Sequence, residues 1–336
     1  MRHLRIFTTL AVIFSLLLTA CQDDSPEIAP VTPSADVELQ ELVDTFNESI
    51  AGIEITEENS DNARFFRRIP TFRVLLRALI QEDLLRPVLT NRWTAFLPTD
   101  KAFAQLGINA HNVGEVEGLR EILLYHVLPE RIRARQFEPV FEPTLNGAAV
   151  EVSLRNKGRV IKINESKVIF ANLPLGRTIG HVVDEVLLPP TESLVDIVTG
   201  NENFSILEAA LVQADLVGAF TDEVSWTVFA PTNEAFVALL DELGFPSLEA
   251  IPNDILTDVL LYHVLGQRVY STDLENGLEA TALNDETFSF DLSGAPLIID
   301  ANGRDIELDT DALNIQATNG VVHVVKRVLL PPLPSM

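Results

Sequence analysis

Four of the six histidines form two matched pairs, and they are the residues with the clearest capacity for chemistry. His126 and His263 each follow a tyrosine, whereas His181 and His323 each lie in a later apolar stretch. Imidazole groups bind zinc or transfer protons near neutral pH. Each copy of the pattern supplies only two histidines, and no cysteine lies near to join them. The pattern therefore favours hydrogen-bonded histidines inside a core over metal ligands or general bases.

Other motifs of catalysis and metal binding are missing from the sequence. It contains no Gly-x-Ser-x-Gly, no His-Glu-x-x-His and no glycine-rich phosphate loop. Residues 300–305 look superficially like a calcium loop, but Gly303 stands in the fourth place rather than the sixth and Arg304 occupies a ligand position. We expect a hairpin turn there. The sequence thus predicts a protein that is not an enzyme, with no catalytic residues, metal or cofactor.

Arginines of the first half form a candidate anion-binding cluster. Its members are Arg64, Arg67, Arg68, Arg73 and Arg77, and Arg131, Arg133 and Arg135 alternate further along the chain. If these side chains meet on one face, they can bind acidic polysaccharide, lipid headgroups or the acidic second half of a neighbouring molecule. Head-to-tail association of that kind could build chains between cells. The alternative is a solvated surface of mixed charge.

The net charge of −25 is spread unevenly along the chain. Residues 38–190 contain 18 basic and 21 acidic residues, whereas residues 191–336 contain 4 basic and 24 acidic residues. The second half therefore carries a charge of −20 and should repel nucleic acid and anionic lipid. We expect no nucleic-acid partner.

The first residues have the features of a targeting segment rather than of a folded domain. A short basic start precedes an apolar run at residues 6–18, which is too short to span a membrane. Residues 18–21, Leu-Thr-Ala-Cys, resemble the lipobox of bacterial lipoproteins. This resemblance implies that Cys21 is lipidated and anchors the protein, and Gln22 in place of an aspartate favours the outer membrane. The alternative is an ordinary secretory signal followed by an incidental cysteine.

The rest of the chain contains one long pattern twice. Trp93 and Trp226 stand 133 residues apart, the two Tyr-His pairs 137 apart, and the two Pro-Pro ends 142 apart. Solenoid repeats are only about 20–50 residues long, so this repeat is a duplicated domain. The expected division is a signal peptide at 1–20, a lipidated cysteine and proline-containing tether at 21–37, and domains at 38–190 and 191–333.

Helices precede strands in each copy. Helical spacing of apolar residues predicts helices at 39–50, 72–85, 117–128 and 254–265, and a helix with Ser205 as its N-cap. Thr99 and Thr232 are expected to cap short helices that follow the strands at 93–96 and 226–229. The last fifty residues of each copy alternate instead, with strands expected at 150–154, 160–163, 168–170, 288–292, 297–300, 306–309 and 321–330. Asn302-Gly303 and Asn319-Gly320 are typical of hairpin turns. This order predicts an α+β domain.

The motifs of the second copy resemble those of the fasciclin domain. Residues 227–236 read Thr-Val-Phe-Ala-Pro-Thr-Asn-Glu-Ala-Phe, a Tyr-His pair follows, and an Asn-Gly and a histidine precede Val-Leu-Leu-Pro-Pro at 328–332. The first copy has Ala95 and Leu97 in place of Val228 and Ala230. It also has Arg-Thr-Ile-Gly at 177–180, which leaves the form of its last turn open.

The resemblance implies a compact β-sandwich with a helical layer in each of two tandem domains. In animal matrix members of the family, short Asp-Ile segments and the Tyr-His region are implicated in binding cell-surface receptors. The matching candidates for partner binding are Asn253, Asp254, Ile255, Tyr262 and His263. Alternatively, Asn253 or Asp254 caps a helix and Ile255 packs in the core.

We therefore interpret the chain as a lipoprotein of the bacterial cell envelope, with its domains facing the periplasm or the cell surface. The resemblance implies adhesion, with a surface protein, a polysaccharide or a second copy of the chain as partner. The alternative is a carrier with a small-ligand pocket between helices and sheet. A large apolar cavity would favour the carrier, and a filled core with an exposed patch would favour adhesion.

Overall fold

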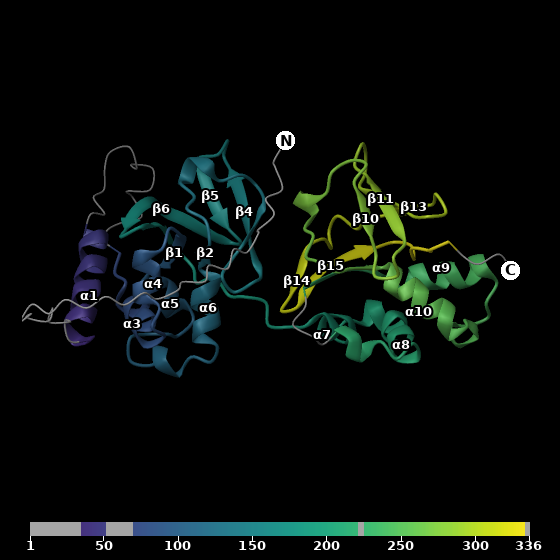
Figure 1. Ribbon diagram of the computed structural model, residues 1–336, viewed down its shortest axis with the longest axis horizontal. Helices are drawn as coiled ribbons and strands as arrows, with labels where there is room; N and C mark the ends of the chain where they lie inside the picture. Colours follow the sequence, from purple (N-terminus) through teal and green to yellow (C-terminus); the bar gives the residue numbers. More distant parts are fainter. Residues whose placement is uncertain (1–34, 52–69, 221–224, 333–336) are drawn as a thin grey trace, which may run out of the picture. The chain divides into compact units, whose positions relative to one another are not determined.

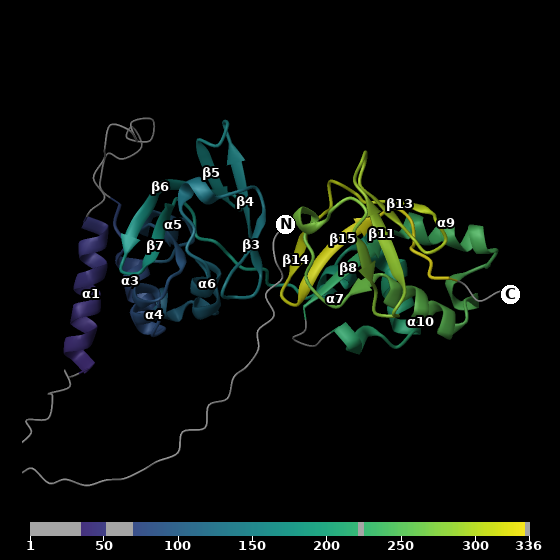
Figure 2. The same ribbon diagram turned by 45° about the horizontal axis from the view of Figure 1, so that its top comes forward.

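The computed structural model describes residues 35–51, 70–220 and 225–332, which form two domains of similar design (Figures 1 and 2). The predicted signal peptide and Cys21 lie outside the described residues. The first helix begins at Ala35, inside the range predicted as tether. None of the described helices is both long and apolar enough to cross a membrane.

The first domain has a layer of helices on a single sheet. Its helices are α1 (Ala35–Ala51), α3 (Arg73–Gln81), α4 (Leu85–Thr90), α5 (Asp100–Gln105) and α6 (Leu119–Tyr125). Its strands are β1 (Thr94–Pro98), β2 (Val127–Leu128), β3 (Phe141–Pro143), β4 (Ala149–Arg155), β5 (Val160–Ile163), β6 (Ser166–Leu175) and β7 (Thr178–Val183). They are ordered β2-β1-β7-β6-β5-β4-β3, with β1 and β7 parallel.

The second domain repeats this plan with two smaller sheets. Its helices are α7 (Leu194–Thr199), α8 (Ser205–Gln213), α9 (Asn233–Leu243) and α10 (Asn253–Tyr262). Its strands are β8 (Trp226–Pro231), β9 (Val264–Leu265), β10 (Glu279–Thr281), β11 (Thr287–Asp291), β12 (Leu297–Ile299), β13 (Asp305–Glu307), β14 (Ile315–Ala317) and β15 (Gly320–Val325). One sheet has the order β10-β11-β12-β13 and the other β14-β15-β8-β9. In Figure 1, helices α7, α8 and α10 lie on one side of β15 and strands β10 and β11 on the other.

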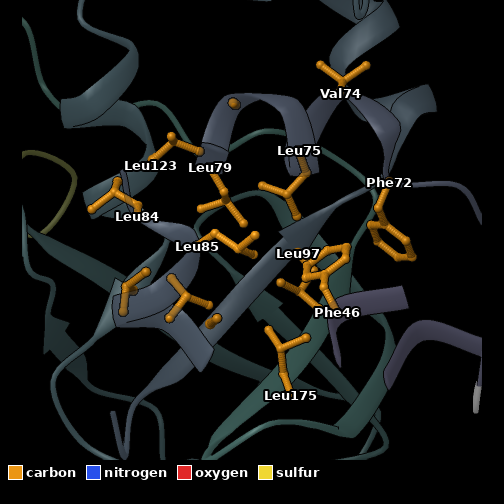
Figure 3. Close-up of a cluster of buried hydrophobic side chains, with 14 of the residues drawn as sticks. Phe46, Phe72, Val74, Leu75, Leu79, Leu84, Leu85, Leu97, Leu123 and Leu175 are labelled. Carbon is orange, nitrogen blue, oxygen red and sulfur yellow. The ribbon is translucent and has the colours of Figure 1, made fainter. Parts of the chain in front are cut away.

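Each domain has two apolar cores, one on each face of its parallel strand pair. In the first domain, Phe46 of α1, Leu75 of α3 and Leu97 of β1 belong to the core under the helices (Figure 3). Phe96, the neighbour of Leu97, belongs to the core between the strands. Neighbouring side chains of a strand point to opposite faces, so one short apolar strand supplies both cores. The second domain has the matching pair of cores, divided at Phe229 and Ala230.

The α+β class with tandem domains is confirmed, as are the N-caps at Thr99 and Thr232, whose hydroxyls accept hydrogen bonds from Ala102 N and Ala235 N. The prediction of one helix over 72–85 is wrong, because the chain turns at Asp83 with a φ of 54°. Ser205 is not an N-cap but the first residue of α8. Phe204 occupies the N-cap position, and its side chain makes no capping hydrogen bond.

The predicted helices at 117–128 and 254–265 extend too far. The helices end at Tyr125 and Tyr262, and the next residues form strands β2 and β9. Val264 and Leu265 pair with Val228 and Thr227 of β8. Apolar side chains fit both a helix and a buried strand, so only this distant pairing determines where the helix ends.

The hairpin before β15 differs from the expected Asn-Gly turn. Its turn residues are Thr318 and Asn319, and Gly320 is already the first residue of β15. A Cβ at Gly320 would lie 2.6 Å from the Trp226 carbonyl oxygen, so the glycine permits close approach of two strands rather than a turn. The Asn319 carboxamide accepts from Leu194 N and thereby ties the turn to the start of α7.

Candidate functional site

The histidine of each Tyr-His motif bridges the end of a helix to the last segment of its domain. His126 Nδ1 lies 2.7 Å from the Ile122 carbonyl oxygen, and Leu187 N donates to His126 Nε2 over 2.9 Å. A backbone N–H can only donate, so Nε2 must be the unprotonated nitrogen and Nδ1 must carry the proton. The ring is therefore held in one neutral tautomer.

His263 has the same environment in the second domain. Its Nδ1 lies 2.7 Å from the Val259 oxygen, and Leu329 N donates to its Nε2 over 2.9 Å. Burial lowers the pKa of both His126 and His263 to about 4, despite their backbone hydrogen bonds. Both rings are thus neutral at physiological pH.

The histidines of the last strands use the opposite tautomer. His181 and His323 place Nε2 at 3.0 and 2.8 Å from the carbonyl oxygens of Ile132 and Val269. Asn172 N and Asn314 N donate to the two Nδ1 atoms, so the proton lies on Nε2. Burial lowers the pKa of His181 to about 4 and also lowers that of His323.

All four repeated histidines therefore use both ring nitrogens within their own domain. No nitrogen keeps a free lone pair toward a metal or a substrate proton. Within the described residues, no group of three or more His, Cys, Asp or Glu side chains is placed to hold a metal ion. The interpretation of these residues as hydrogen-bonded core histidines is confirmed.

The tyrosines of the Tyr-His motifs are also internal links. Tyr125 donates through its hydroxyl to the Ala149 oxygen, and Tyr262 donates to the Thr287 oxygen. Both side chains are buried, and burial raises the pKa of Tyr262 to about 12. Each tyrosine thus ties the end of a helix to a distant strand.

The motif that begins at each tryptophan also makes contacts inside its own domain, through a threonine hydroxyl and a phenylalanine ring. Thr94 and Thr227, each directly after a tryptophan, are fully buried. Thr227 donates to the Gln267 oxygen and accepts from Val269 N, and Thr94 makes the matching pair of bonds. The Phe229 ring stacks on His323 with centroids 5.6 Å apart. The motif that marks each copy is therefore a packing device.

Two further positions with structural roles were missed in the sequence. Asn172 and Asn314 both adopt positive φ, and their carboxamides accept from Ala134 N and Ser271 N. Each stands nine residues before the last-strand histidine, and that repeated spacing was a signal in the sequence. The second position is the residue after each capping threonine: Asp100 accepts from Val74 N near the start of α3, and Asn233 accepts from Ile206 N near the start of α8, so each caps an earlier helix.

The candidates for partner binding in the second domain do not share one surface. Asn253 and Asp254 are exposed in the first turn of α10, whereas Ile255 is half-buried and packs against the helical core. Tyr262 and His263 are buried at the other end of the helix, so they do not face a partner in the folded domain. Asn253 and Asp254 do not act as side-chain caps, because α10 has Pro252 at the N-cap position.

Only part of the arginine cluster belongs to the described residues. Arg73 and Arg77 are exposed one helical turn apart on α3. Arg64, Arg67 and Arg68 lie outside the described residues. Arg131 donates to the Arg177 oxygen, which commits it to a local contact.

The calcium-like segment at residues 300–305 is a turn in which an arginine neutralises the aspartate charge. The Asp300 carboxylate is buried, accepts from Asn302 N and Arg304 N, and forms an ion pair with the Arg304 guanidinium at 2.8 Å. A cation bound by this carboxylate would have to displace Arg304. The expectation of a turn is confirmed, with Gly303 at a φ of 70°.

An apolar cavity lies between the helices and the sheet of the second domain. It has a volume of about 40 Å³ and is lined by residues that include Leu194, Val198, Leu211, Val228 and Leu260. An engineered cavity that binds benzene has about 150 Å³, and ligand pockets usually have about 300–1,000 Å³. The cavity is therefore too small for an organic ligand of ordinary size.

A family model supports these repeated geometries. The fasciclin domain model matches the chain twice, at residues 70–189 and 202–331. The chain belongs to the fasciclin domain family and carries two such domains in tandem. Fasciclin domains are found in extracellular and cell-surface proteins, and in homologues they are known for cell adhesion and binding to the extracellular matrix.

Similar proteins include bacterial and animal chains. Protein sll1483 of Synechocystis is 35% identical over 156 residues, which cover 45% of this chain and 81% of that protein. Transforming growth factor-beta-induced protein ig-h3 of Sus scrofa is 29% identical over 63% of this chain, but the match spans only 30% of that protein. A FAS1 domain pair from the insect cell adhesion molecule Fasciclin I aligns over 79% of this chain and 97% of its own, with 18% identity and a TM-score of 0.37.

Proposed function

We propose that this chain is an adhesion protein of the bacterial cell envelope that binds a surface protein or polysaccharide. The proposal rests on the burial and hydrogen bonding of the side chains in the repeated motifs. Their histidines, tyrosines and threonines are buried and paired within the domains. Side chains that are buried and hydrogen-bonded inside the core cannot contact a partner. Recognition must then occur at the exposed surface, as adhesion requires.

The carrier alternative has less support. It needs an enclosed apolar pocket, and the second domain has a cavity of only about 40 Å³ between helices and sheet. Such a space holds one or two small molecules of solvent size rather than a metabolite. The filled cores favour binding at the surface.

The proposal includes a lipid anchor on Cys21 in the outer membrane. One acyl chain binds a membrane only marginally, and more than one gives lasting attachment. Replacing Cys21 by Ser should move the protein from the membrane fraction to the soluble fraction and abolish labelling by a radioactive fatty acid. Membrane retention and labelling that persist in Cys21→Ser would contradict the anchor.

Adhesion is tested by capture with the full chain. Beads coated with the purified protein should retain whole cells of the producing strain, or purified acidic and neutral polysaccharides, above beads coated with an unrelated acidic protein. The unrelated protein controls for charge, because the net charge of −25 attracts cationic material without specificity. Retention no greater than that of the control would contradict the proposal.

Asn253 and Asp254 remain candidates for the contact because both are exposed. Replacing both by Ala leaves the core unchanged and should lower capture if this helix start is the binding surface. Glu202 and Asn203, also exposed in a short turn of the second domain, provide the matched Ala control. Equal capture by both variants would remove the α10 start from the proposal.

A further inference from the structure

An open groove of about 710 Å³ runs along α8 in the second domain. We call it the α8 groove, and its lining includes Ser205, Glu208, Ala209, Val212, Leu248 and Glu249. Val212 is 63% exposed, although it is a large apolar residue. The groove thus combines an exposed apolar side chain with two carboxylates.

The groove exists because small residues occupy the outer face of α8. The helix α3 of the first domain is its counterpart: both have nine residues, both end in glutamine, and both are followed by an aspartate at positive φ. Ser205 and Ala209 of α8 stand where α3 has Arg73 and Arg77.

The same face therefore carries opposite charge in the two domains. On α3 it has two arginines and the helix contains no acidic residue, whereas α8 contains Glu208 and no basic residue. Glu249, from the short helical turn Leu248–Ala250, adds a second carboxylate to the lining of the groove. Within the described residues, neither Arg73 nor Arg77 forms an ion pair.

The exposed face of α3 also has the spacing of a helix that docks in a groove. Arg73, Arg77 and Ile80 stand at positions i, i+4 and i+7, which lie on one side of a helix. Amphipathic helices that bind in grooves use this spacing for apolar anchors, whereas the first two positions of α3 carry charge, so the contact that α3 offers is mainly ionic. Ile80 is half-buried because it also packs against the helical core of its own domain, and its exposed part continues the line of the two arginines.

We propose that the α8 groove of one molecule binds the α3 face of a second copy of this chain, so that Arg73 and Arg77 enter the space above Ser205 and Ala209 and pair with Glu208 and Glu249. The contact joins two different surfaces, so it is heterologous and builds chains of molecules rather than closed pairs. It rests on the proposed adhesion function and names a second copy as the partner.

Charge excludes the other pairings of these faces. Two second domains, each at −20, repel one another, and two α3 faces place arginine against arginine. A first domain at −3 meets a second domain with far less repulsion. The pairing of α3 with the α8 groove is thus the one that the charges favour.

The test is a charge exchange in the full chain, with each sample in the same detergent and with association measured by sedimentation velocity. The chain with Arg73→Glu and Arg77→Glu presents two negative faces, and the chain with Glu208→Lys and Glu249→Lys presents two positive faces. Each alone should self-associate at least about tenfold more weakly than the natural chain. An equimolar mixture of the two should associate again, because every contact is then between opposite charges.

Matched controls change the same number of charges elsewhere. Arg155→Glu with Arg159→Glu, and Glu275→Lys with Glu279→Lys, alter exposed residues outside both faces. These variants should associate like the natural chain. All substituted residues except Glu208, which is half-buried, are exposed, and circular dichroism together with the thermal midpoint verifies that each variant folds.

Three results would overturn the proposal: a natural chain that stays monomeric at the highest concentration reached, charge reversal that leaves association unchanged, or a mixture that does not associate. The capture of cells and polysaccharide is measured on the same variants. Capture that persists while self-association is absent would leave the adhesion function standing and remove only the second copy as partner. Loss of capture by every folded variant and by the natural chain would contradict the adhesion function itself.

Discussion

The two domains share their buried polar links and differ in how they fill the space beside them. Both hold the same two histidine tautomers, the same buried threonine and the same tyrosine bond between helix and strand. They differ in the size of apolar residues in the helical core and in the charge on the outer helix. Polar geometry is specified to a fraction of an ångström, whereas apolar volume is satisfied by several combinations of residues.

The exchange of volumes is clearest across the parallel strand pair. The first domain has Leu97 in β1 and Gly180 in β7, and a Cβ on Gly180 would lie 2.8 Å from Leu97 Cδ1. At the matching places the second domain has Ala230 and Val322, both fully buried. One domain places the bulk on the first strand and the other places it on the last. These departures of the first copy from the motif therefore compensate one another.

Acid is expected to produce the largest effect and tests whether the shared links behave alike. His126, His181 and His263 have a folded pKa of about 4 and an ordinary unfolded value of 6.5. Between these values the unfolded chain binds protons that the folded chain does not, so stability falls as pH falls from 6.5 to 4. Each histidine should lower the free energy of unfolding by up to about 3 kcal/mol over this window, with stability fully present above pH 6.5.

Urea unfolding at several pH values measures this effect in each domain, because Trp93 and Trp226 are the only tryptophans and each domain has one. Trp226→Phe leaves a probe of the first domain, and Trp93→Phe leaves a probe of the second. Adding His126→Gln should flatten the pH dependence of the first domain by up to one bound proton and leave the second unchanged. An unaltered slope would mean that His126 is not neutral in the folded state.

The second test breaks and restores the volume exchange. Leu97→Ala should destabilise the first domain by about 3 kcal/mol through a cavity, and Gly180→Val by about 1–3 kcal/mol through overpacking. The double variant reproduces the pattern of the second domain and should cost at least about 1 kcal/mol less than the sum of the single changes. Denaturant unfolding followed by Trp93 measures all three. Strict additivity would show that the two positions do not share one space.

Much of this design could be predicted from the sequence, because it repeats. The spacing of Thr99, Thr232 and the four histidines predicted caps and buried rings, and both were found. The role of Gly320 was not predictable, since it depends on the Trp226 carbonyl of a strand almost a hundred residues away. Likewise, the strand at Val264 looks helical until its partner in β8 is known.

The candidate site was harder to predict than the fold. The recurrence of the motif residues reflects burial, as at Tyr262 and His263, rather than an exposed binding surface. The α8 groove arises because the side chains of Ser205 and Ala209 are small and because Glu249 lies nearby on another segment. No local pattern encodes a hollow between two segments, so only the folded arrangement reveals it.

The third test concerns the helical core. Leu-Val-Asp occurs at 42–44 and at 194–196, which places Phe46 of α1 and Val198 of α7 at matching positions. Phe46 is fully buried, and Val198 lines the cavity of about 40 Å³. Phe46→Val should cost the first domain about 2–3 kcal/mol, whereas Val198→Leu should stabilise the second by up to about 1 kcal/mol by filling space. Urea midpoints of the two domains check both, and a destabilising Val198→Leu would show that the cavity is closed to added volume.

The smallest expected effect concerns the two helix caps, Asp100 and Asn233, which accept equivalent hydrogen bonds through a carboxylate and a carboxamide. Asp100 accepts from Val74 N through one carboxylate oxygen. Asn233 accepts from Ile206 N and also donates through Nδ2 to the Glu202 oxygen at 2.8 Å and to Ser205 Oγ at 3.0 Å. Asp100→Asn keeps the acceptor and loses only the charge near a helix N-terminus, which should cost about 0.3–1 kcal/mol.

The reverse exchange should not be equivalent. Asn233→Asp removes the donor and faces a carboxylate oxygen toward the Glu202 oxygen, so it should cost about 1–2 kcal/mol at neutral pH. Protonation restores a donor, so this extra cost, measured as the difference in unfolding free energy from the natural chain, should shrink as pH falls through the aspartate pKa. An equal loss of unfolding free energy at pH 7 and at pH 4 would mean that the hydrogen bond to the Glu202 oxygen contributes nothing. Asp100 and Asn233 would then be equivalent caps.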